Sequence, residues 1–379
     1  DGQAIVMSRT SILDGFLAMF ALAAFLCVVK DQQSARPRLM RTLREWDQVT
    51  APRSGWRDLR AFLLVRDRRG FAVGPNAGNR PWLLAAGVLC GLAGSVKWSG
   101  IYVLALLGLF VAIREITARW AAGHPSPVRG ALLADVWWAF ILMVPPAILT
   151  YIASWFGWFI HPRAYGHGRS GISGFGGALA DLWLYHRDMW KFHNGLETPH
   201  TYQSNPYTWL AQIRPTSFHW ANGEAVTGCP SGNCATNVVA LGNPILWWIG
   251  IGALMLVVWG TFYYRNWRAG VILTGYLALY VPWLGYAHRT IFTFYTVAFA
   301  PFVALAVAWM IGLLAGAVAP DGQPSILPMP RRTEITGRVM AVGLTLTILA
   351  CALWFLPLWR ADVVDYDFWR AHMWLPTWI

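Results

Sequence analysis

Apolar residues along the 379-residue chain gather in long runs separated by polar and charged segments. A helix of about 20 apolar residues crosses the roughly 30 Å hydrocarbon core of a bilayer, and runs of about 17 are long enough. Such runs predict an all-α polytopic membrane protein, with clear spans at residues 12–29, 137–160, 244–263, 270–286, 291–316 and 339–358.

The stretch 82–113 is mostly apolar but is interrupted near its middle by Gly91, Gly94, Ser95 and Lys97. It could form one long tilted span, or two short spans at 82–95 and 98–113. Lys and Arg collect in cytoplasmic loops, and loop 30–80 carries 12 of them against 5 acidic residues. With two short spans, the four cytoplasmic loops hold 20 of the 30 basic residues. We therefore expect two short spans, and eight crossings in all.

This topology puts both ends of the chain outside the cytoplasm. It divides the chain into an N-terminal part of the membrane bundle (1–160), a large extracytoplasmic loop (161–243), and a C-terminal part with an outer tail (244–379). Loop 30–80 is expected to be irregular, with its arginines held on anionic lipid.

Composition supports a membrane protein. Hydrophobic residues make up 56% of the chain and charged residues 13%, about half the charged share of a soluble domain. The 24 tryptophans suit a protein with many membrane–water boundaries. These values exclude a disordered chain, a coiled coil, a disulfide-dense secreted module, and a nucleic-acid binder whose net charge of +12 lies on one face. Because the sequence starts at Asp1 without Met or a signal peptide, we expect it to be part of a longer protein.

Cys229 and Cys234 lie in "TGCPSGNCATN" on the predicted outer loop, where turn-forming residues separate them. In an oxidising compartment they are expected to form a disulfide, the alternative being two free thiols. Cys27, Cys90 and Cys351 fall inside spans. Six of the nine histidines lie on the outer loop without metal-ligand spacing, so no metal site is expected.

Two cations lie at the outer ends of predicted spans. Lys97 lies in "GLAGSVKWSG", where burial in the membrane costs about 2.5–3.5 kcal/mol unless the side chain snorkels or meets an anion. Either it snorkels, or it opposes a phosphate that the neighbouring glycines let approach the backbone. Arg9 precedes the first span, with Asp14 about one turn further on. It either pairs with Asp14 or faces a phosphate or a sugar.

The outer loop is polar and aromatic together, most clearly in "HNGLETPHTYQSNPYTWLAQIRPTSF". Aromatic faces combined with hydroxyl and amide groups suit a sugar ring or an extended peptide. The alternative is a folded loop that only caps the bundle. Arg289, in the outer turn "GYAHRTIFTFY", either snorkels or lines the same cavity.

Four segments together resemble the protein O-mannosyltransferases of glycosyltransferase family 39, in particular the actinobacterial type. They are "SRTSILDGFLAMF", "GLAGSVKWSGIY", "HTYQSNPYTWLAQIRP" and "GYAHRTIFTFY", spread over residues 7–295. The resemblance implies a GT-C helical bundle. Family members are said to have eleven spans, of which the eight expected here would be the last. An outer loop of 83 residues is too short for the β-trefoil domain of the eukaryotic relatives.

By resemblance, such enzymes transfer mannose from polyprenyl-phosphate-mannose to Ser or Thr hydroxyls of exported proteins, with inversion and without a metal or other cofactor. The resemblance assigns Arg9 and Lys97 to the donor phosphate and active site. His200, Tyr202, Ser204 and Arg214 would shape the donor and acceptor groove, with Arg289 in the same wall. The general base, an Asp of an Asp-Glu pair, is expected upstream of Asp1, so residues 1–379 alone are expected to be inactive.

The resemblance also implies a multi-pass protein of the bacterial plasma membrane with its active face outside. Its partners would be membrane lipid, the lipid-linked donor, Ser/Thr-rich exported proteins and the protein-export channel; no nucleic acid is expected. The alternatives are another GT-C polyprenyl-phosphate-sugar transferase (arabinosyl or lipid-modifying), a transporter, and a non-catalytic scaffold. The transporter is disfavoured because the charges gather at one face and no internal repeat is evident.

Overall fold

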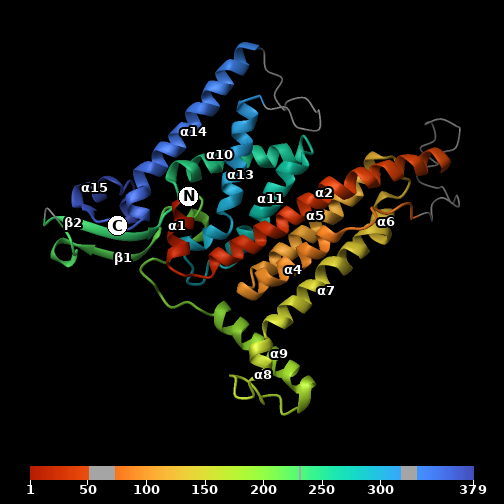
Figure 1. Cartoon of the computed structure of the whole chain (residues 1–379), viewed down its shortest axis with the longest axis horizontal. Helices are drawn as coiled ribbons and strands as arrows, with labels where there is room; N and C mark the ends of the chain where they lie inside the picture. Colours follow the sequence, from red (N-terminus) through yellow and green to blue (C-terminus); the bar gives the residue numbers. More distant parts are fainter. Residues whose placement is uncertain (51–72, 230–231, 317–330) are drawn as a thin grey trace. The chain divides into compact units, whose positions relative to one another are not determined.

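The computed structural model describes residues 1–50, 73–229, 232–316 and 331–379. The chain divides into two compact units, one of residues 19–156 and one of residues 1–18 together with 157–379. Helices dominate both units (Figure 1). Each unit is described by itself below.

The unit of residues 19–156 is a helical bundle. Its helices are α2 (Asp14–Thr50, which begins in the other unit), α4 (Pro81–Val96), α5 (Gly100–Ala121), and a continuous run of α6 (Pro127–Ala131), η2 (Leu132–Val136) and α7 (Trp137–Ser154). Helices α4 and α7 approach closely because Gly87 and Gly91 of α4 lie against the backbone of Met143 and Ala147. Small residues at such a crossing let membrane helices pack backbone to backbone.

The expectation of an irregular loop at 30–80 is wrong for its first part, because α2 continues as a helix to Thr50. Ala35, Leu39 and Leu43 recur every four residues and are buried against Ala77 and Ala118. This apolar stripe keeps the helical period, so α2 runs on beyond its membrane-length segment. Residues 51–72 of the predicted lipid-bound loop lie outside the described residues.

Six charged side chains of this bundle, three arginines and three acids, form a fully buried cluster between its helices. Its members are Asp31, Arg80, Arg114, Glu115, Arg119 and Asp135. Arg114 contacts both Asp31 (2.6 Å) and Glu115 (2.7 Å), and Arg80 contacts Asp31 and Glu115. Arg119 pairs with Asp135. The cluster joins α2, α5, η2 and the start of α4. Its arginines neutralise the charge of the buried acids. Arg80 was expected, as a residue of loop 30–80, to lie on anionic lipid, but it is buried in this cluster and does not face lipid.

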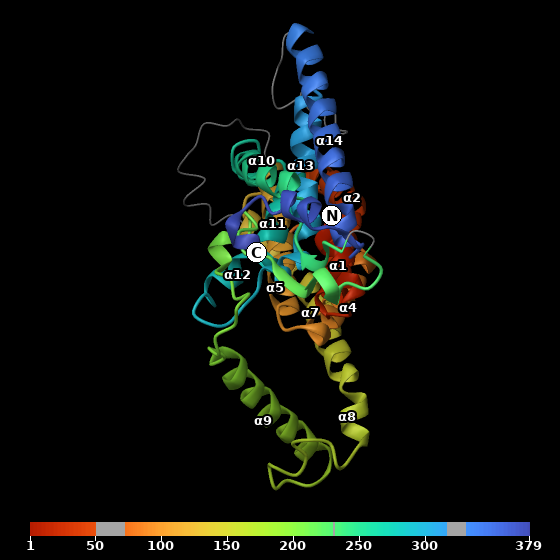
Figure 2. The ribbon, with the colours of Figure 1, turned by 90° about the vertical axis from the view of Figure 1, so that its left-hand side faces the viewer.

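The second unit contains the helices α1 (Gly2–Arg9), α8 (Phe156–Ile160), α9 (Gly174–Asn194), α10 (Pro244–Phe262), α11 (Trp267–Leu279), α12 (Val281–Leu284), α13 (Ala300–Leu314), α14 (Arg331–Trp359) and α15 (Tyr366–Ala371). Short helical turns lie at η3 (Pro206–Thr208), η4 (Gly223–Ala225), η5 (Thr293–Ala298) and η6 (Pro376–Trp378). Helix α10 packs on α11 and α13, and α1 packs on α14 and η5. Figure 2 shows the chain turning back from α8 into α9 through loop 161–173.

A small antiparallel sheet of order β1-β2-β3 lies in this unit, with strands β1 (Thr216–Asn222), β2 (Cys234–Ala240) and β3 (Val364–Asp365). Thr216 pairs with Ala240 and Asn222 with Ala235, with an irregularity between Ser217 and His219. The Cys229–Cys234 disulfide closes the connection between β1 and β2. Val239, Ala240 and Leu241 pack with Phe355 and Trp359 of α14. The second half of the outer loop is therefore an ordered sheet built onto helix α14.

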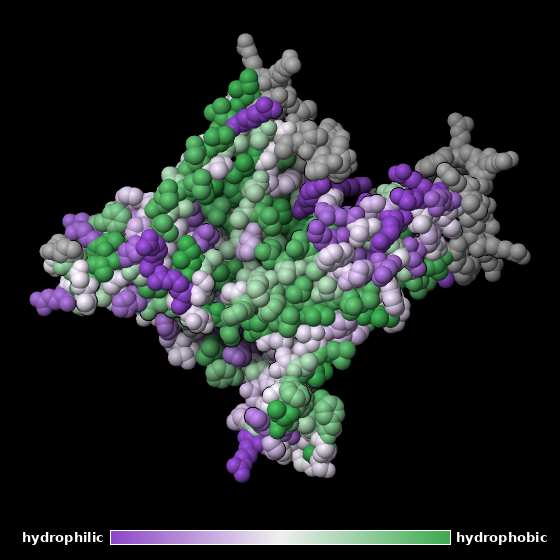
Figure 3. Space-filling view, viewed as in Figure 1, coloured by the Kyte–Doolittle hydropathy of each residue, from purple (hydrophilic) through white to green (hydrophobic). Residues whose placement is uncertain are grey.

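Four helices of the described residues are long and apolar enough to cross a membrane: Gly100–Ala121, Pro127–Ser154, Pro244–Phe262 and Ile335–Trp359. Two shorter apolar helices, Pro81–Val96 and Ala300–Leu314, lie at other predicted spans. The predicted span 270–286 is divided between α11 and α12, which begins immediately before Pro282. Figure 3 shows apolar side chains spread over the surface of the helices, as a lipid-facing surface requires. The multi-pass prediction holds, and the number of eight crossings stays a prediction.

Candidate functional site

Two of the four segments singled out in the sequence lie against each other. Residues 196–204 lie alongside residues 290–293. The backbone N–H of Thr290 donates to the Leu196 carbonyl, and the backbone N–H of Ser204 donates to the Ile291 carbonyl, each at 2.9 Å. The Thr290 hydroxyl also donates to the Thr198 carbonyl. These bonds bring the block "HTYQSNPYTW" beside the block "GYAHRTIFTFY".

Ser204 is the buried centre of this contact. Its hydroxyl accepts a hydrogen bond from the indole N–H of Trp209 (2.9 Å) and shares one with the Thr293 hydroxyl (2.9 Å). Trp209 is fully buried among the rings of Trp283 and Tyr295. Ser204, predicted to line the groove, instead holds its wall in position.

Helix α1, which leads into the segment "SRTSILDG", joins the same region. Gln3, which is fully buried, donates to the Thr293 carbonyl (3.2 Å) and accepts from the Thr296 hydroxyl (2.8 Å). At the start of α2, Asp14 is buried. Asp14 and Arg289 both act electrostatically on Tyr295. Three sequence blocks that are far apart in the chain therefore converge around residues 289–296.

Arg289 is the cation at this convergence. Its side chain is half-buried, and its Nε is buried without a hydrogen-bond partner among the described residues. A buried guanidinium N–H without a partner is costly and is expected to find an acceptor. Phosphate oxygens suit a guanidinium well, because its planar fork donates to two oxygens at once. Arg289 can therefore receive an anion.

His200 and Tyr202 lie on the segment that is bonded to residues 290–293, which follow this cation in the chain. The His200 ring meets Phe292 edge to face at 5.0 Å and lies 6.2 Å from the Tyr202 ring. His200 is exposed and Tyr202 is half-buried, with one face of the Tyr202 ring covered by Arg214. They are suited to stacking on a sugar or a peptide side chain.

The guanidinium groups of Arg214 and Arg9 donate hydrogen bonds to backbone carbonyl groups. Arg214 donates to the Thr377 carbonyl (2.7 Å) and to the Thr201 carbonyl (3.2 Å), with its guanidinium over the Tyr202 ring. It thus ties the outer loop to the C-terminal segment. Arg9, at the end of α1, is exposed and donates to the Trp359 carbonyl at 3.1 Å.

Lys97 lies in the other unit, half-buried in the short turn between α4 and α5. Beside it, Trp98 donates its indole N–H to the Tyr151 hydroxyl at 3.0 Å. Two of the neighbouring glycines, Gly91 and Gly100, are closed by helix packing and are not open to a ligand as the sequence suggested. A side chain at Gly91 would meet Ala147 of α7, and one at Gly100 would meet the backbone of Ala93 in α4. These glycines are needed for helix packing.

Two acids of the predicted outer loop, Asp181 and Asp188, hold loop 161–173. Asp181 accepts from the backbone N–H groups of Gly168 and Ser170, and Asp188 pairs with Arg169 at 2.6 Å. Burial alone would raise the pKa of Asp181, but the two backbone N–H groups outweigh it, and the pKa is lowered. The Arg169 bond lowers the pKa of Asp188. Both carboxyl groups therefore stay ionised and structural.

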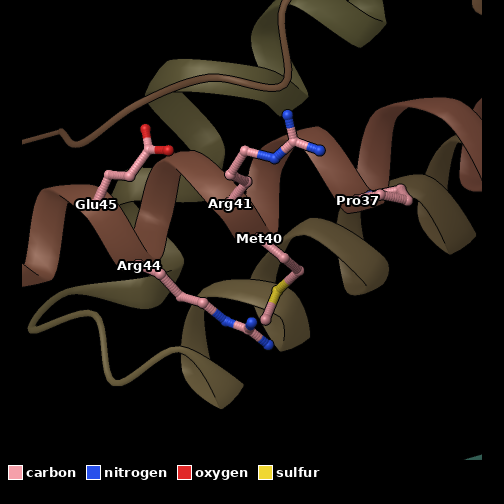
Figure 4. A pocket seen from close by; sticks show the side chains of 5 residues that line it. All are labelled: Pro37, Met40, Arg41, Arg44 and Glu45. Carbon is pink, nitrogen blue, oxygen red and sulfur yellow. The ribbon is translucent and has the colours of Figure 1, made fainter.

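The described residues contain no group of His, Cys, Asp and Glu arranged to hold a metal ion. A shallow hollow lined by Pro37, Met40, Arg41, Arg44 and Glu45 lies on α2 alone (Figure 4). None of the site residues predicted from the sequence lines this hollow.

The buried ion cluster around Arg80 and Asp31 was missed in the sequence. Its members come from four separate segments, and charge counting treated each as a loop residue. One signal was available: Asp31, Glu115 and Asp135 each lie within a few residues of the end of an apolar run, where an isolated acid needs a partner.

Comparison with known proteins agrees with this convergence of motifs. Residues 178–378 match the C-terminal four-transmembrane region of the protein O-mannosyltransferases, and residues 76–155 match the dolichyl-phosphate-mannose-protein mannosyltransferase family. A polyprenol-phosphate-mannose–protein mannosyltransferase of Mycolicibacterium smegmatis is 32% identical over 393 aligned positions, which cover 100% of this chain and 70% of that protein.

Relatives with the same description in Mycobacterium tuberculosis and Corynebacterium glutamicum are 28% and 29% identical, and each match covers 100% of this chain and 69% of the relative. A solved structure of the Saccharomyces cerevisiae protein O-mannosyltransferase Pmt1–Pmt2 complex, bound to the sugar donor, aligns with a TM-score of 0.40 and 19% identity over 55% of this chain and 27% of that one. On the family match and the full-length relatives, this chain belongs to the protein O-mannosyltransferase family.

Proposed function

We propose that the protein transfers mannose from polyprenyl-phosphate-mannose to Ser or Thr hydroxyls of exported proteins, at the extracytoplasmic face of the plasma membrane. Membership of the family, with similarity along the whole chain, carries this proposal. The described residues add a cation with a buried N–H that lacks a partner, Arg289, three residues before Phe292, on which the exposed His200 ring packs. That combination suits a lipid-linked sugar phosphate.

In the proposed reaction the bond between the anomeric carbon of mannose and the phosphate oxygen breaks. The Ser or Thr oxygen attacks the opposite face of the sugar, so the anomeric centre inverts, and a carboxylate takes the hydroxyl proton. Negative charge grows on the leaving polyprenyl phosphate. A cation fixed beside it lowers the barrier because it needs no rearrangement when that charge appears.

We assign Arg289 to the leaving phosphate, with His200 and Tyr202 beside the sugar or the acceptor. Ser204, Thr293 and Arg214 position these residues through the bonds described above. Arg9 and Lys97 are further candidates for the donor phosphate. We place the general base on an Asp upstream of Asp1 in the full-length protein, because Asp181 and Asp188 are committed to loop 161–173.

The test is a transfer assay with the full-length protein in liposomes. The substrates are polyprenyl-phosphate-mannose and a Ser/Thr-rich peptide, and the controls are the matching Ala peptide and a nucleotide-linked mannose donor. We expect mannosylated peptide only with the lipid-linked donor and the hydroxyl peptide. Transfer from the nucleotide donor, or none from either, would overturn the proposal. Arabinosyl transfer from the corresponding lipid donor would favour the alternative GT-C reaction.

A further inference from the structure

Helix α9 has an exposed apolar face. Phe175, Leu179 and Trp183 recur every four residues, and Trp190 follows seven residues later, so the four side chains share one side of the helix. Their exposed fractions are 69%, 38%, 72% and 50%. Lys191 is exposed and lies off this face, about 100° around the helix from Trp190. The helix is therefore amphipathic, with aromatic residues on its open face.

The polar side of α9 is held by its own loop, which fixes the rotation of the helix. Asp181 accepts two backbone N–H groups of the loop, and Asp188 pairs with Arg169. Gly177 packs so closely on the Ile172 carbonyl that a side chain there would collide with it. The apolar face is thus presented outward by specific contacts of the polar face.

The chain reaches α9 directly from a membrane-length helix. The apolar helix Pro127–Ser154 is followed by α8, whose Phe156 and Ile160 are 66% and 53% exposed. The Trp158 ring of α8 stacks on His167 at 3.8 Å and meets Tyr185 of α9 edge to face at 6.5 Å. Helices α8 and α9 therefore form one aromatic unit at the point where the chain leaves the bilayer.

We propose that the face of Phe175, Leu179, Trp183 and Trp190 lies in the boundary between lipid headgroups and acyl chains of the extracytoplasmic leaflet. Tryptophan and phenylalanine favour this boundary, and amphipathic helices lie in its plane with their apolar side toward the acyl chains. Lys191 then lies toward the water, whereas Arg187, four residues after Trp183 and three before Trp190, borders the apolar face and extends its guanidinium to the headgroups. The assignment to the extracytoplasmic leaflet rests on the topology in the proposed function. The proposed contact with lipid does not depend on that topology.

Spin labels on single cysteines test this proposal in the full-length protein in liposomes. Cys27, Cys90 and Cys351, which are buried and free, are replaced by Ala, and the Cys229–Cys234 disulfide is kept. Leu179→Cys and Trp183→Cys are the test variants, and Lys191→Cys is the matched control on the same helix. Each label is exposed to oxygen, which concentrates in lipid, and to a water-soluble nickel relaxant. Gel filtration and mannosyl transfer of the same samples report folding and function separately.

We expect labels at 179 and 183 to collide several-fold more with oxygen than with nickel, and the label at 191 to show the reverse. Equal access to nickel at all three positions would overturn the proposal, because the face would be in water. Protection from both relaxants at 179 and 183 would also overturn it, since protein would then cover the face. Reaction of Lys191→Cys with an impermeant thiol reagent outside intact cells supports the extracytoplasmic leaflet; reaction only after lysis overturns that assignment without affecting the lipid contact.

Discussion

The side-chain hydroxyls of Ser204 and Thr293 share a hydrogen bond of 2.9 Å, although 89 residues separate them in the chain. This bond, with the Ser204–Ile291 backbone bond, joins the outer loop to the turn that carries Arg289. In a family whose reaction needs a donor phosphate and an acceptor hydroxyl held together, this junction fixes the position of the cation relative to the aromatic rings of the loop.

The junction predicts the effect of Thr293→Val. The variant keeps the side-chain volume but removes the hydrogen bonds that the Thr293 hydroxyl makes with the Ser204 hydroxyl, which is buried, and with the Arg214 carbonyl, which is partly buried. A buried partner left unpaired costs about 1–3 kcal/mol. We expect a lower unfolding midpoint in detergent. Thr347→Val is the control, because Thr347 is exposed and bonds only within α14; equal loss in the two variants would contradict a role for the junction.

Arg289→Gln is expected to lower transfer by about 100-fold, since removal of one preorganised group that stabilises developing charge has effects of this size. Arg289→Lys retains the charge but loses the fork, so it should recover part of the activity. Turnover is measured with saturating donor. The matched control is Arg187→Gln on the exposed surface of α9. Full activity of Arg289→Gln would remove Arg289 from the site.

The buried cluster makes a prediction about stability. Asp135→Asn keeps the acceptor for the Ala77 N–H but leaves the buried Arg119 with only the more distant Glu115, at 4.0 Å. Breaking one buried ion pair in this way costs about 3–5 kcal/mol. Adding Arg119→Met removes the stranded charge, so the double variant should be more stable than Asp135→Asn alone. Thermal unfolding of the four members of this cycle measures the coupling, and additive losses would show that the two residues do not act as a pair.

Loop 161–173 should respond to acid. The pKa of Asp181 is lowered in the folded protein, so its ionised form favours the docked loop. This contribution is complete above the ordinary value of about 3.8 and is lost as the pH falls below it. We expect the Gly168 and Ser170 amides to exchange more slowly in the wild type than in Asp181→Asn at pH 6, measured by mass spectrometry. At pH 3 this difference should shrink, and an unchanged ratio would argue against the carboxylate as the anchor.

Features that depend on local sequence could be predicted, and features that depend on distant pairing could not. Apolar runs located α7, α10 and α14 because hydropathy is a property of neighbouring residues. Hydropathy also placed the end of the first span at residue 29 and did not predict that α2 continues to Thr50. The stripe of Ala35, Leu39 and Leu43 that supports this continuation is recognisable only once its partners Ala77 and Ala118 are known.

The candidate site follows the same division. The sequence blocks pointed to His200, Tyr202 and Arg289 as groove residues. Residue type alone, however, could not distinguish a residue that faces a ligand from one whose side chain is hydrogen-bonded within the protein. Ser204 and Arg214 carry polar groups that suit a ligand, and they bond Thr293 and the Thr377 carbonyl instead. The ion cluster was missed because Asp31 and Asp135 pair with arginines of other segments, Asp31 with Arg80 and Arg114, and Asp135 with Arg119.

The most direct test of the central claim is complementation in a Corynebacterium glutamicum strain that lacks its matching relative. Mass spectrometry of the exported proteins would measure hexose on Ser and Thr. Mannosylation should return with the full-length wild-type protein and fail to return with Arg289→Gln expressed at the same level. Exported proteins that stay unmodified with the wild-type protein, although it is present in the membrane, would contradict the assignment of protein O-mannosyl transfer.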